Sequence, residues 1–259
     1  MNLSSREKPA SVRAPYDLGQ YFGAAYLINL KDRNDRLAAA KKEFARAGWR
    51  FGLGGIEAYP AKRFSERLGF PSPQVRGCFY SHWECLRAAH AQGKKSVLIM
   101  EDDIALAPSI KEIIPPIMSD LSVKPWGVIY LGHEDTGAIS NANSHSVDVS
   151  LMPFTGIVRG CHFYAVSGSV LPKLLHHLER VATGVEGDQE FGPMPIDGAL
   201  SIFRRNNPDV VTLIAAPKVG WQRASRSDIA PRAFDRIRVA RPLVTFLRNA
   251  KNHFARSRS

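Results

Sequence analysis

The chain has 259 residues, of which 44% are hydrophobic and 23% are charged, and this is the composition of an ordinary globular protein. It excludes collagen, a coiled coil and wholesale disorder, and the length suits one large α/β domain with tails. The formal net charge is +11. Arginine and lysine are concentrated near the C-terminus, so we expect a lead-in at residues 1–22, a mildly basic domain at 23–230 and a basic tail at 231–259.

The sequence has the features of a cytoplasmic protein. No apolar stretch approaches the about 20 residues of a spanning helix, and residues 1–15 do not resemble a signal peptide. Three cysteines without a C-x-x-C pair indicate reduced thiols. Residues 232–259 carry basic and apolar side chains at roughly helical spacing. They fit peripheral binding to the anionic inner face of the cytoplasmic membrane as well as a helix docked on the domain.

Apolar strands alternate with amphipathic helices along the domain. Strands are predicted at residues 24–30, 95–100, 126–132, 160–166 and 210–215, and helices at 33–47, 80–92, 110–121, 171–181 and 196–205. Asp32 is the expected cap of the first of these helices. Residues 52–60 and 184–194 are expected to be loops, and residues 133–156 a long loop or an irregular hairpin. The alternation predicts an α/β fold in a single domain, with a mostly parallel central sheet flanked by helices.

Three adjacent carboxylates, Glu101, Asp102 and Asp103, follow one of the apolar strands. Neighbouring carboxylates repel one another unless a cation neutralises them, and Mg²⁺ or Mn²⁺ prefers such oxygens and commonly bridges to phosphates. In open α/β sheets the ligand crevice lies at the carboxyl ends of the strands. The triplet therefore indicates a metal–phosphate site, and the alternative is a solvated acidic turn that caps the next helix.

Two arginines follow the first strand. Arg33 and Arg36 are three residues apart, a spacing that makes side chains neighbours on a helix. Guanidinium groups match the geometry of phosphate, so both arginines can contact one anion. Exposed helix charges are the alternative interpretation.

Several motifs occur in a characteristic order. They are Asn29-Leu30-x-x-Arg33-x-x-Arg36, Gly77-Cys78-x-x-Ser81-His82, Glu101-Asp102-Asp103, Gly160-Cys161-His162, Pro195-Ile196-Asp197, and Gln222 with Ser227-Asp228. In this order they resemble glycosyltransferase family 25, which contains lipopolysaccharide and lipooligosaccharide galactosyltransferases and the collagen galactosyltransferases. The resemblance covers about residues 24–230. Arg76 departs from the family pattern by adding positive charge beside the second motif.

The resemblance implies a GT-A-like fold, a UDP-sugar donor such as UDP-galactose, a Mn²⁺ or Mg²⁺ ion and inversion at the anomeric carbon. The acidic triplet matches the D-x-D-like motif of the family. Asp103, with Asp102, is expected to hold the metal, and Glu101 to face the ribose. The donor-binding residues that the resemblance implies are Asn29, Arg33, Arg36, His82, Glu101 and Asp102.

An inverting transfer needs a carboxylate base for the acceptor hydroxyl. Asp197 is the candidate, with Asp188 and Glu190 as rivals on a nearby loop. Gln222 and Asp228 are expected either to close the site from the C-terminal side or to be structural. The implied function is transfer of a hexose, such as galactose, from a UDP-sugar to a glycan or lipid-linked glycan acceptor in surface polysaccharide biosynthesis.

Two other classes of protein are alternatives to a glycosyltransferase. One is a non-catalytic binding protein of the same fold, against which the intact acidic triplet and Asp197 argue weakly. The other is a nucleic-acid-binding protein, because the chain is basic. Most of the excess charge lies in the terminal segment, and no basic–aromatic binding motif stands out in the domain. We therefore expect no nucleic-acid partner.

Overall fold

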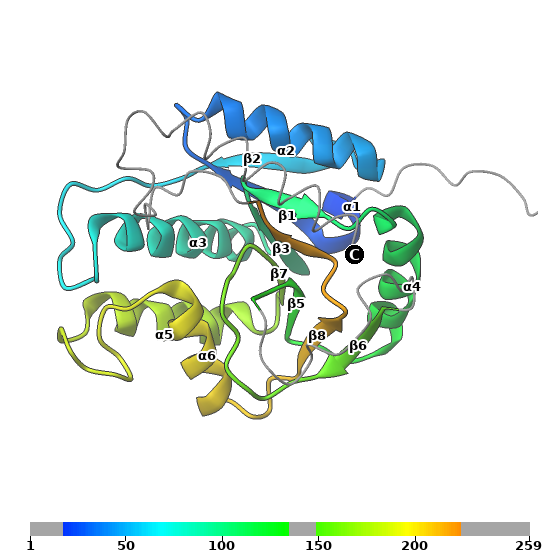
Figure 1. Ribbon diagram of the computed structural model, residues 1–259. Coiled ribbons are helices and arrows are strands. Elements are labelled where there is room, and N and C mark those ends of the chain that lie inside the picture. Colours follow the sequence, from blue (N-terminus) through cyan, green and yellow to red (C-terminus); the bar gives the residue numbers. More distant parts are fainter. Residues whose placement is uncertain (1–17, 135–148, 224–259) are drawn as a thin grey trace, which may run out of the picture.

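The computed structural model describes residues 18–134 and 149–223. Within these ranges, a nine-stranded sheet lies between two layers of helices (Figure 1). None of the helices in the described ranges is long and apolar enough to cross a bilayer. The basic tail and Asp228, for which the sequence predicts roles, lie outside the described residues.

The described residues form nine strands and six helices. The strands are β1 (Gly23–Asn29), β2 (Ile56–Pro60), β3 (Ser96–Glu101), β4 (Ile104–Leu106), β5 (Val128–Gly132), β6 (Ser150–Pro153), β7 (Phe163–Ser167), β8 (Thr212–Ala216) and β9 (Gly220–Gln222). The helices are α1 (Leu18–Phe22), α2 (Asn34–Ala47), α3 (Pro73–Ala91), α4 (Ile110–Val123), α5 (Leu171–Thr183) and α6 (Ile196–Asn206).

The sheet has the strand order β2-β1-β3-β7-β5-β8-β6. β2, β1 and β3 are parallel neighbours, and β5 and β8 are also parallel. β7 runs antiparallel between β3 and β5, and β6 runs antiparallel to β8. The short β4 pairs with β9, which also joins β5. The predicted α/β fold with a mostly parallel sheet flanked by helices is confirmed.

The central strands are apolar on both faces because helices cover both. Leu27 of β1 and Met100 of β3 belong to the core shared with α1, α2 and α4. Their neighbours Tyr26 and Ile99 belong to the core shared with α3, α5 and α6 (Figure 1). Strands buried in this way are near-continuous hydrophobic runs, and this explains why β1 and β3 stood out in the sequence.

The carboxyl ends of three parallel strands meet at one edge of the sheet. Asn29 of β1 is in register with Pro60 of β2, and Ile28 of β1 is in register with Glu101 of β3. The residues that follow these strands are therefore brought together, although they are 30 to 70 positions apart in the sequence.

Helix α3 begins seven residues earlier than the sequence predicted. Ser72 caps it, because its Oγ accepts a hydrogen bond from the Val75 backbone N–H at 3.1 Å, and Pro73 occupies the first helical position, where its missing N–H costs nothing. Cys78, which the prediction placed before the helix, therefore lies inside it.

Other local expectations were also wrong. Residues 52–60 were expected to be a loop but contain β2. Within residues 133–156, for which a long loop or an irregular hairpin was expected, β6 pairs with the distant strand β8. Asp32 does not cap α2: the helix begins at Asn34 without a side-chain cap, and Asp32 pairs with Arg63 at 3.1 Å. Residues 18–22 of the expected lead-in form α1, whose side chains contribute to the core.

Candidate functional site

A pocket of about 400 Å³ opens at the edge where β1, β2 and β3 end. In open α/β sheets, ligands bind in this position. Its charged lining residues are Arg36, Lys62, Arg63, Glu101, Asp102 and Asp103, and its apolar lining includes Ile28, Leu30 and Phe64. A concave site with an apolar wall and a few converging charged groups is typical of a small-molecule pocket.

One face of α3 holds a wall of this pocket in place. A Cβ atom on Gly77 would lie 2.6 Å from the Lys62 carbonyl oxygen, so only glycine permits this approach. Ser81, one turn further along, accepts a hydrogen bond from the Lys62 backbone N–H at 2.7 Å and donates one to the Gly77 carbonyl at 2.6 Å. The glycine and serine of the Gly77-Cys78-x-x-Ser81-His82 motif thus fix the segment that follows β2.

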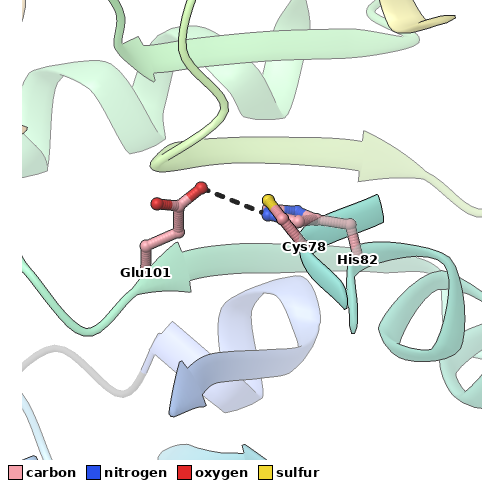
Figure 2. A group of neighbouring side chains, drawn as sticks. All are labelled: Cys78, His82 and Glu101. Atoms are coloured by element: carbon pink, nitrogen blue, oxygen red, sulfur yellow. Dashed lines mark hydrogen bonds and ion pairs between the residues drawn. The ribbon is translucent and has the colours of Figure 1, made fainter. Parts of the chain in front are cut away.

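The other two residues of that motif, Cys78 and His82, face Glu101 of the acidic triplet (Figure 2). His82 is 1% exposed. Its Nε2 lies 3.2 Å from Glu101 Oε1, and its Nδ1 lies 3.1 Å from the Tyr164 hydroxyl. Cys78, His82 and Glu101 each place one potential ligand atom within 4.8 Å of the other two. The sequence singled out His82 but assigned no role to Cys78.

Glu101 is held from two sides. Besides His82, the Gln222 side chain contacts it, because Gln222 Nε2 donates a hydrogen bond to Glu101 Oε2 at 2.9 Å. Burial by itself would raise the pKa of Glu101, but the hydrogen bond and charge of His82, with help from Gln222, lower it overall. Glu101 is therefore an ionised acceptor with a fixed orientation. Gln222, at the end of β9, also lines the pocket, and its role in closing the site stays a prediction.

Asp102 is engaged by the protein through both oxygens. Its Oδ1 lies 3.0 Å from Arg36 Nη1, and its Oδ2 accepts a hydrogen bond from Asn29 Nδ2 at 2.7 Å. Burial raises the pKa of Asp102, and Arg36 and Asn29 oppose this rise. The residue links the ends of β1 and β3 to the start of α2, so its main effect is to position Arg36 and Asn29.

Asp103 differs from its neighbours. Burial, reinforced by the charge of Glu101, raises its pKa to about 7. Its Oδ1 is buried and has no hydrogen-bond partner among the described residues, yet Asp103 lines the pocket. A buried carboxylate oxygen without a partner is costly, and a hard divalent cation supplies the missing contact. The Mn²⁺ or Mg²⁺ ion that the sequence resemblance implies therefore fits at Asp103.

Arginine side chains surround the triplet from two elements. Of the two arginines in the first motif, Arg36 lines the pocket, whereas Arg33 lies outside the lining and pairs with Asp35 at 2.9 Å. Arg223, which the sequence did not single out, donates a hydrogen bond from its guanidinium to the Asp102 backbone carbonyl at 2.6 Å and one from its backbone N–H to the Asp103 carbonyl at 2.7 Å. Arg223 thereby fixes the turn that carries both carboxylates.

The candidate bases do not line the pocket. Asp197 lies in the first turn of α6, and its carboxylate accepts hydrogen bonds from the backbone N–H groups of Gly160 and Gly198 at 3.2 and 2.9 Å. Asp188 is exposed and accepts hydrogen bonds from its own loop, and Glu190 contacts Asn206 at 2.7 Å. The role of each as a base stays a prediction.

Three residues of the pocket lining were not predicted from the sequence, because the strand that precedes them, β2, was not predicted. Lys62, Arg63 and Phe64 line the pocket because they come directly after β2, which was expected to be a loop. The short run Ile56–Pro60 before them was the available signal. Recognition of this run as a strand parallel to β1 would have placed these three side chains at the same sheet edge as the acidic triplet.

Comparisons with known proteins add little to this geometry. No family profile and no curated protein matches the sequence. Several solved structures are similar to part of the chain, and two of them are described here. One is a glycosyltransferase involved in the glycosylation of the major capsid of PBCV-1, with a TM-score of 0.47, 10% identity, and coverage of 78% of this chain and 93% of that chain. The other is apo GlyE, a glycosyltransferase of Streptococcus pneumoniae TIGR4, with a TM-score of 0.35, 13% identity, and coverage of 73% and 44%. Likeness at this level carries no weight for function.

Proposed function

We propose that this chain is a glycosyltransferase that binds a nucleotide sugar in the pocket at Glu101–Asp103. The observation that carries the proposal is Asp103, whose buried Oδ1 lacks a partner in a pocket that basic residues also line. The position of the pocket at the carboxyl ends of parallel strands and the sequence resemblance to glycosyltransferase family 25 support the same conclusion, including a GT-A-like fold.

Asp103 is the residue we assign to the divalent cation. Bound Mn²⁺ or Mg²⁺ stabilises the negative charge that develops on a departing diphosphate. Asp102 contributes indirectly, since it holds Arg36 at the pocket wall. Lys62 and Arg63, which also line the pocket, add positive potential that attracts an anionic donor.

The remaining lining suits the uncharged parts of a nucleotide sugar. Phe64 and Leu30 offer an apolar surface. Glu101, oriented by His82 and Gln222, offers carboxylate oxygens to the hydroxyl groups of a ribose. By resemblance alone we assign UDP-galactose as the donor and a surface glycan, free or lipid-linked, as the acceptor.

Asp197 is proposed as the base that takes the proton of the acceptor hydroxyl. The hydroxyl oxygen then attacks the anomeric carbon from the side opposite the leaving diphosphate, and the configuration inverts. Because Asp197 lies outside the pocket lining, the acceptor in this scheme binds beside the donor pocket. The basic tail is proposed to bring the protein to an anionic membrane surface, where a lipid-linked acceptor would lie.

Nucleotide binding tests the proposal directly. Isothermal titration of the full chain with UDP and UDP-galactose, with and without Mn²⁺, should show binding that requires the metal and is lost in Asp103→Asn. Asp188→Asn is the matched control, since Asp188 is exposed and contacts only its own loop. Binding of equal strength without metal, or unchanged in Asp103→Asn, contradicts the assignment. Metal-dependent binding without any sugar transfer or donor hydrolysis favours a non-catalytic binding protein.

A further inference from the structure

Cys78 and His82 form a pair of potential metal ligands on α3. They are four residues apart, a spacing that places side chains on the same helix face, and both project toward Glu101 at the end of β3 (Figure 2). One ligand atom of each residue lies within 4.8 Å of the others. Tetrahedral zinc, with bonds of about 2.0–2.3 Å, holds its ligand atoms roughly 3.3–3.8 Å apart. The 3.2 Å separation of His82 Nε2 and Glu101 Oε1 is already close to this range.

Partners outside the cluster hold two of the three side chains in the required orientation. The Tyr164 hydroxyl contacts His82 Nδ1 at 3.1 Å, and this leaves Nε2 to face Glu101. Gln222 binds Oε2 of Glu101 at 2.9 Å, which leaves Oε1 to face His82. Hydrogen bonds to the far side of histidine and carboxylate ligands fix their orientation in metal sites and typically raise metal affinity.

The cluster is reached from the pocket. His82 is buried, whereas Cys78 and Glu101 keep partial exposure, and all three residues line the pocket. An ion held by these three residues would therefore be accessible from the pocket, as in zinc sites that also bind water or a small ligand.

We infer that Cys78, His82 and Glu101 form a binding site for Zn²⁺, distinct from the hard-cation position at Asp103. Thiolate and imidazole ligands suit zinc, whereas carboxylate, carbonyl and water oxygens suit Mg²⁺ and Mn²⁺. The inference goes beyond the proposed function, because it concerns a different ion and a different set of ligands.

Zinc binding releases two protons to solvent, one from the Cys78 thiol and one from His82 Nε2, which donates it to the Glu101 carboxylate in the metal-free protein. The Cys78 S–H bond breaks, its proton passes to solvent and a Zn–S bond forms, because the thiolate is the ligand. His82 binds through unprotonated Nε2, while Nδ1 carries the ring proton and donates it in a hydrogen bond to the Tyr164 oxygen. The thiolate and the Glu101 carboxylate together neutralise the double positive charge.

Cobalt substitution tests the site by a readout that does not depend on activity. The reduced full chain is titrated with Co²⁺, and tetrahedral thiolate coordination is followed by its sulfur-to-cobalt charge-transfer absorption. We expect this band at one equivalent, its displacement by Zn²⁺, and its loss in Cys78→Ser. Cys85→Ala is the matched control, because Cys85 lies on the same helix but in the core and outside the pocket lining.

A second variant covers the case in which Cys78→Ser does not fold, as judged by circular dichroism. Tyr164→Phe keeps all three ligands and removes only the partner of His82 Nδ1, so the charge-transfer band should remain while zinc affinity, measured against a chromophoric chelator, falls about 10-fold. Unchanged affinity overturns the inference, as does a folded wild-type protein without the band or a band that survives in folded Cys78→Ser.

Asp103→Asn separates this inference from the proposed function. The variant should keep the band, because Asp103 is not among the three ligands, although it should lose Mn²⁺-dependent nucleotide binding. Loss of the band in folded Asp103→Asn would show that the thiophilic ion uses Asp103, and would overturn the three-residue site.

Discussion

Arg36 and Asp102 form an ion pair of 3.0 Å that joins the start of α2 to the turn after β3. Both side chains are largely buried, at 13% and 8% exposure. Arg33 belongs to the same sequence motif but pairs with Asp35, whose side chain is 67% exposed. Two arginines that look equivalent in the sequence are therefore in different electrostatic environments.

Replacing these arginines should have unequal effects on stability. Arg36→Ala leaves the Asp102 carboxylate buried without its cation, and breaking a buried pair in this way costs about 3–5 kcal/mol. Arg33→Ala removes a pair with an exposed partner, for which about 0–1 kcal/mol is expected. Urea unfolding at neutral pH measures both free energies. Equal losses would show that Asp102 does not depend on Arg36.

Asp103→Asn should stabilise the metal-free protein at alkaline pH. The pKa of Asp103 is raised from 3.8 to about 7, so the folded state holds a proton that the unfolded chain releases between about pH 4 and pH 7. Stability due to Asp103 therefore falls as pH rises through this window. At pH 8 the variant should be about 1–3 kcal/mol more stable than the wild type, and the difference should shrink as pH falls and vanish below about pH 4.

The difference in unfolding free energy between the wild type and Asp103→Asn separates the contribution of Asp103 from those of other titrating groups. Burial lowers the pKa of His162 to about 4, which destabilises both proteins alike in acid and cancels in the difference. Thermal unfolding of both proteins from about pH 4 to pH 8 gives the difference as a function of pH. Addition of Mn²⁺ at pH 8 should raise the melting temperature of the wild type and leave Asp103→Asn unchanged. A difference that does not vary with pH contradicts the buried, unpartnered environment of Asp103.

The parts of the fold that could be predicted are those with strong local signals. β1 and β3 are buried on both faces, so their apolar runs were visible without knowledge of the fold. β2 was missed because most of its residues keep some exposure, and such a strand lacks a continuous apolar run. The start of α3 was missed because Ser72 and Pro73 were not read as a cap and a first helical residue.

The location of the candidate site could be predicted from the sequence, but the different environments of its three carboxylates could not. The triplet at the end of β3 was found because strand ends meet at one sheet edge. Which carboxylate is neutralised by the protein depends on Arg36, 66 positions away in the sequence from Asp102. The side chains at successive positions of a turn have different surroundings, and only the packed structure shows that Asp102 is paired while Asp103 Oδ1 is not.

Gly77→Ala should disturb the pocket wall. The new Cβ would lie 2.6 Å from the Lys62 carbonyl oxygen, so the backbone must move and the hydrogen bond from Lys62 to Ser81 is strained. We expect a loss of about 1–3 kcal/mol from this overpacking, partly offset by the better helix propensity of alanine. Urea unfolding and nucleotide titration measure the two consequences.

Gly198→Ala in α6 is the matched control for that substitution. The atom nearest to its added Cβ is Met194 Sδ at 3.5 Å, an ordinary contact, so this variant should be neutral or slightly stabilising. If Gly77→Ala behaves in the same way, the close approach of α3 to Lys62 does not hold the pocket wall.

Asp197→Asn tests the assignment of the base. An amide cannot accept the acceptor proton, so sugar transfer should fall by about 10²–10⁴-fold, while Mn²⁺-dependent nucleotide binding stays unchanged because Asp197 does not line the donor pocket. Asp188→Asn and Glu190→Gln alter exposed loop residues and should retain transfer. If either of these loop variants loses transfer while Asp197→Asn keeps it, the base lies on the loop, and Asp197 serves only to bind the backbone of Gly160.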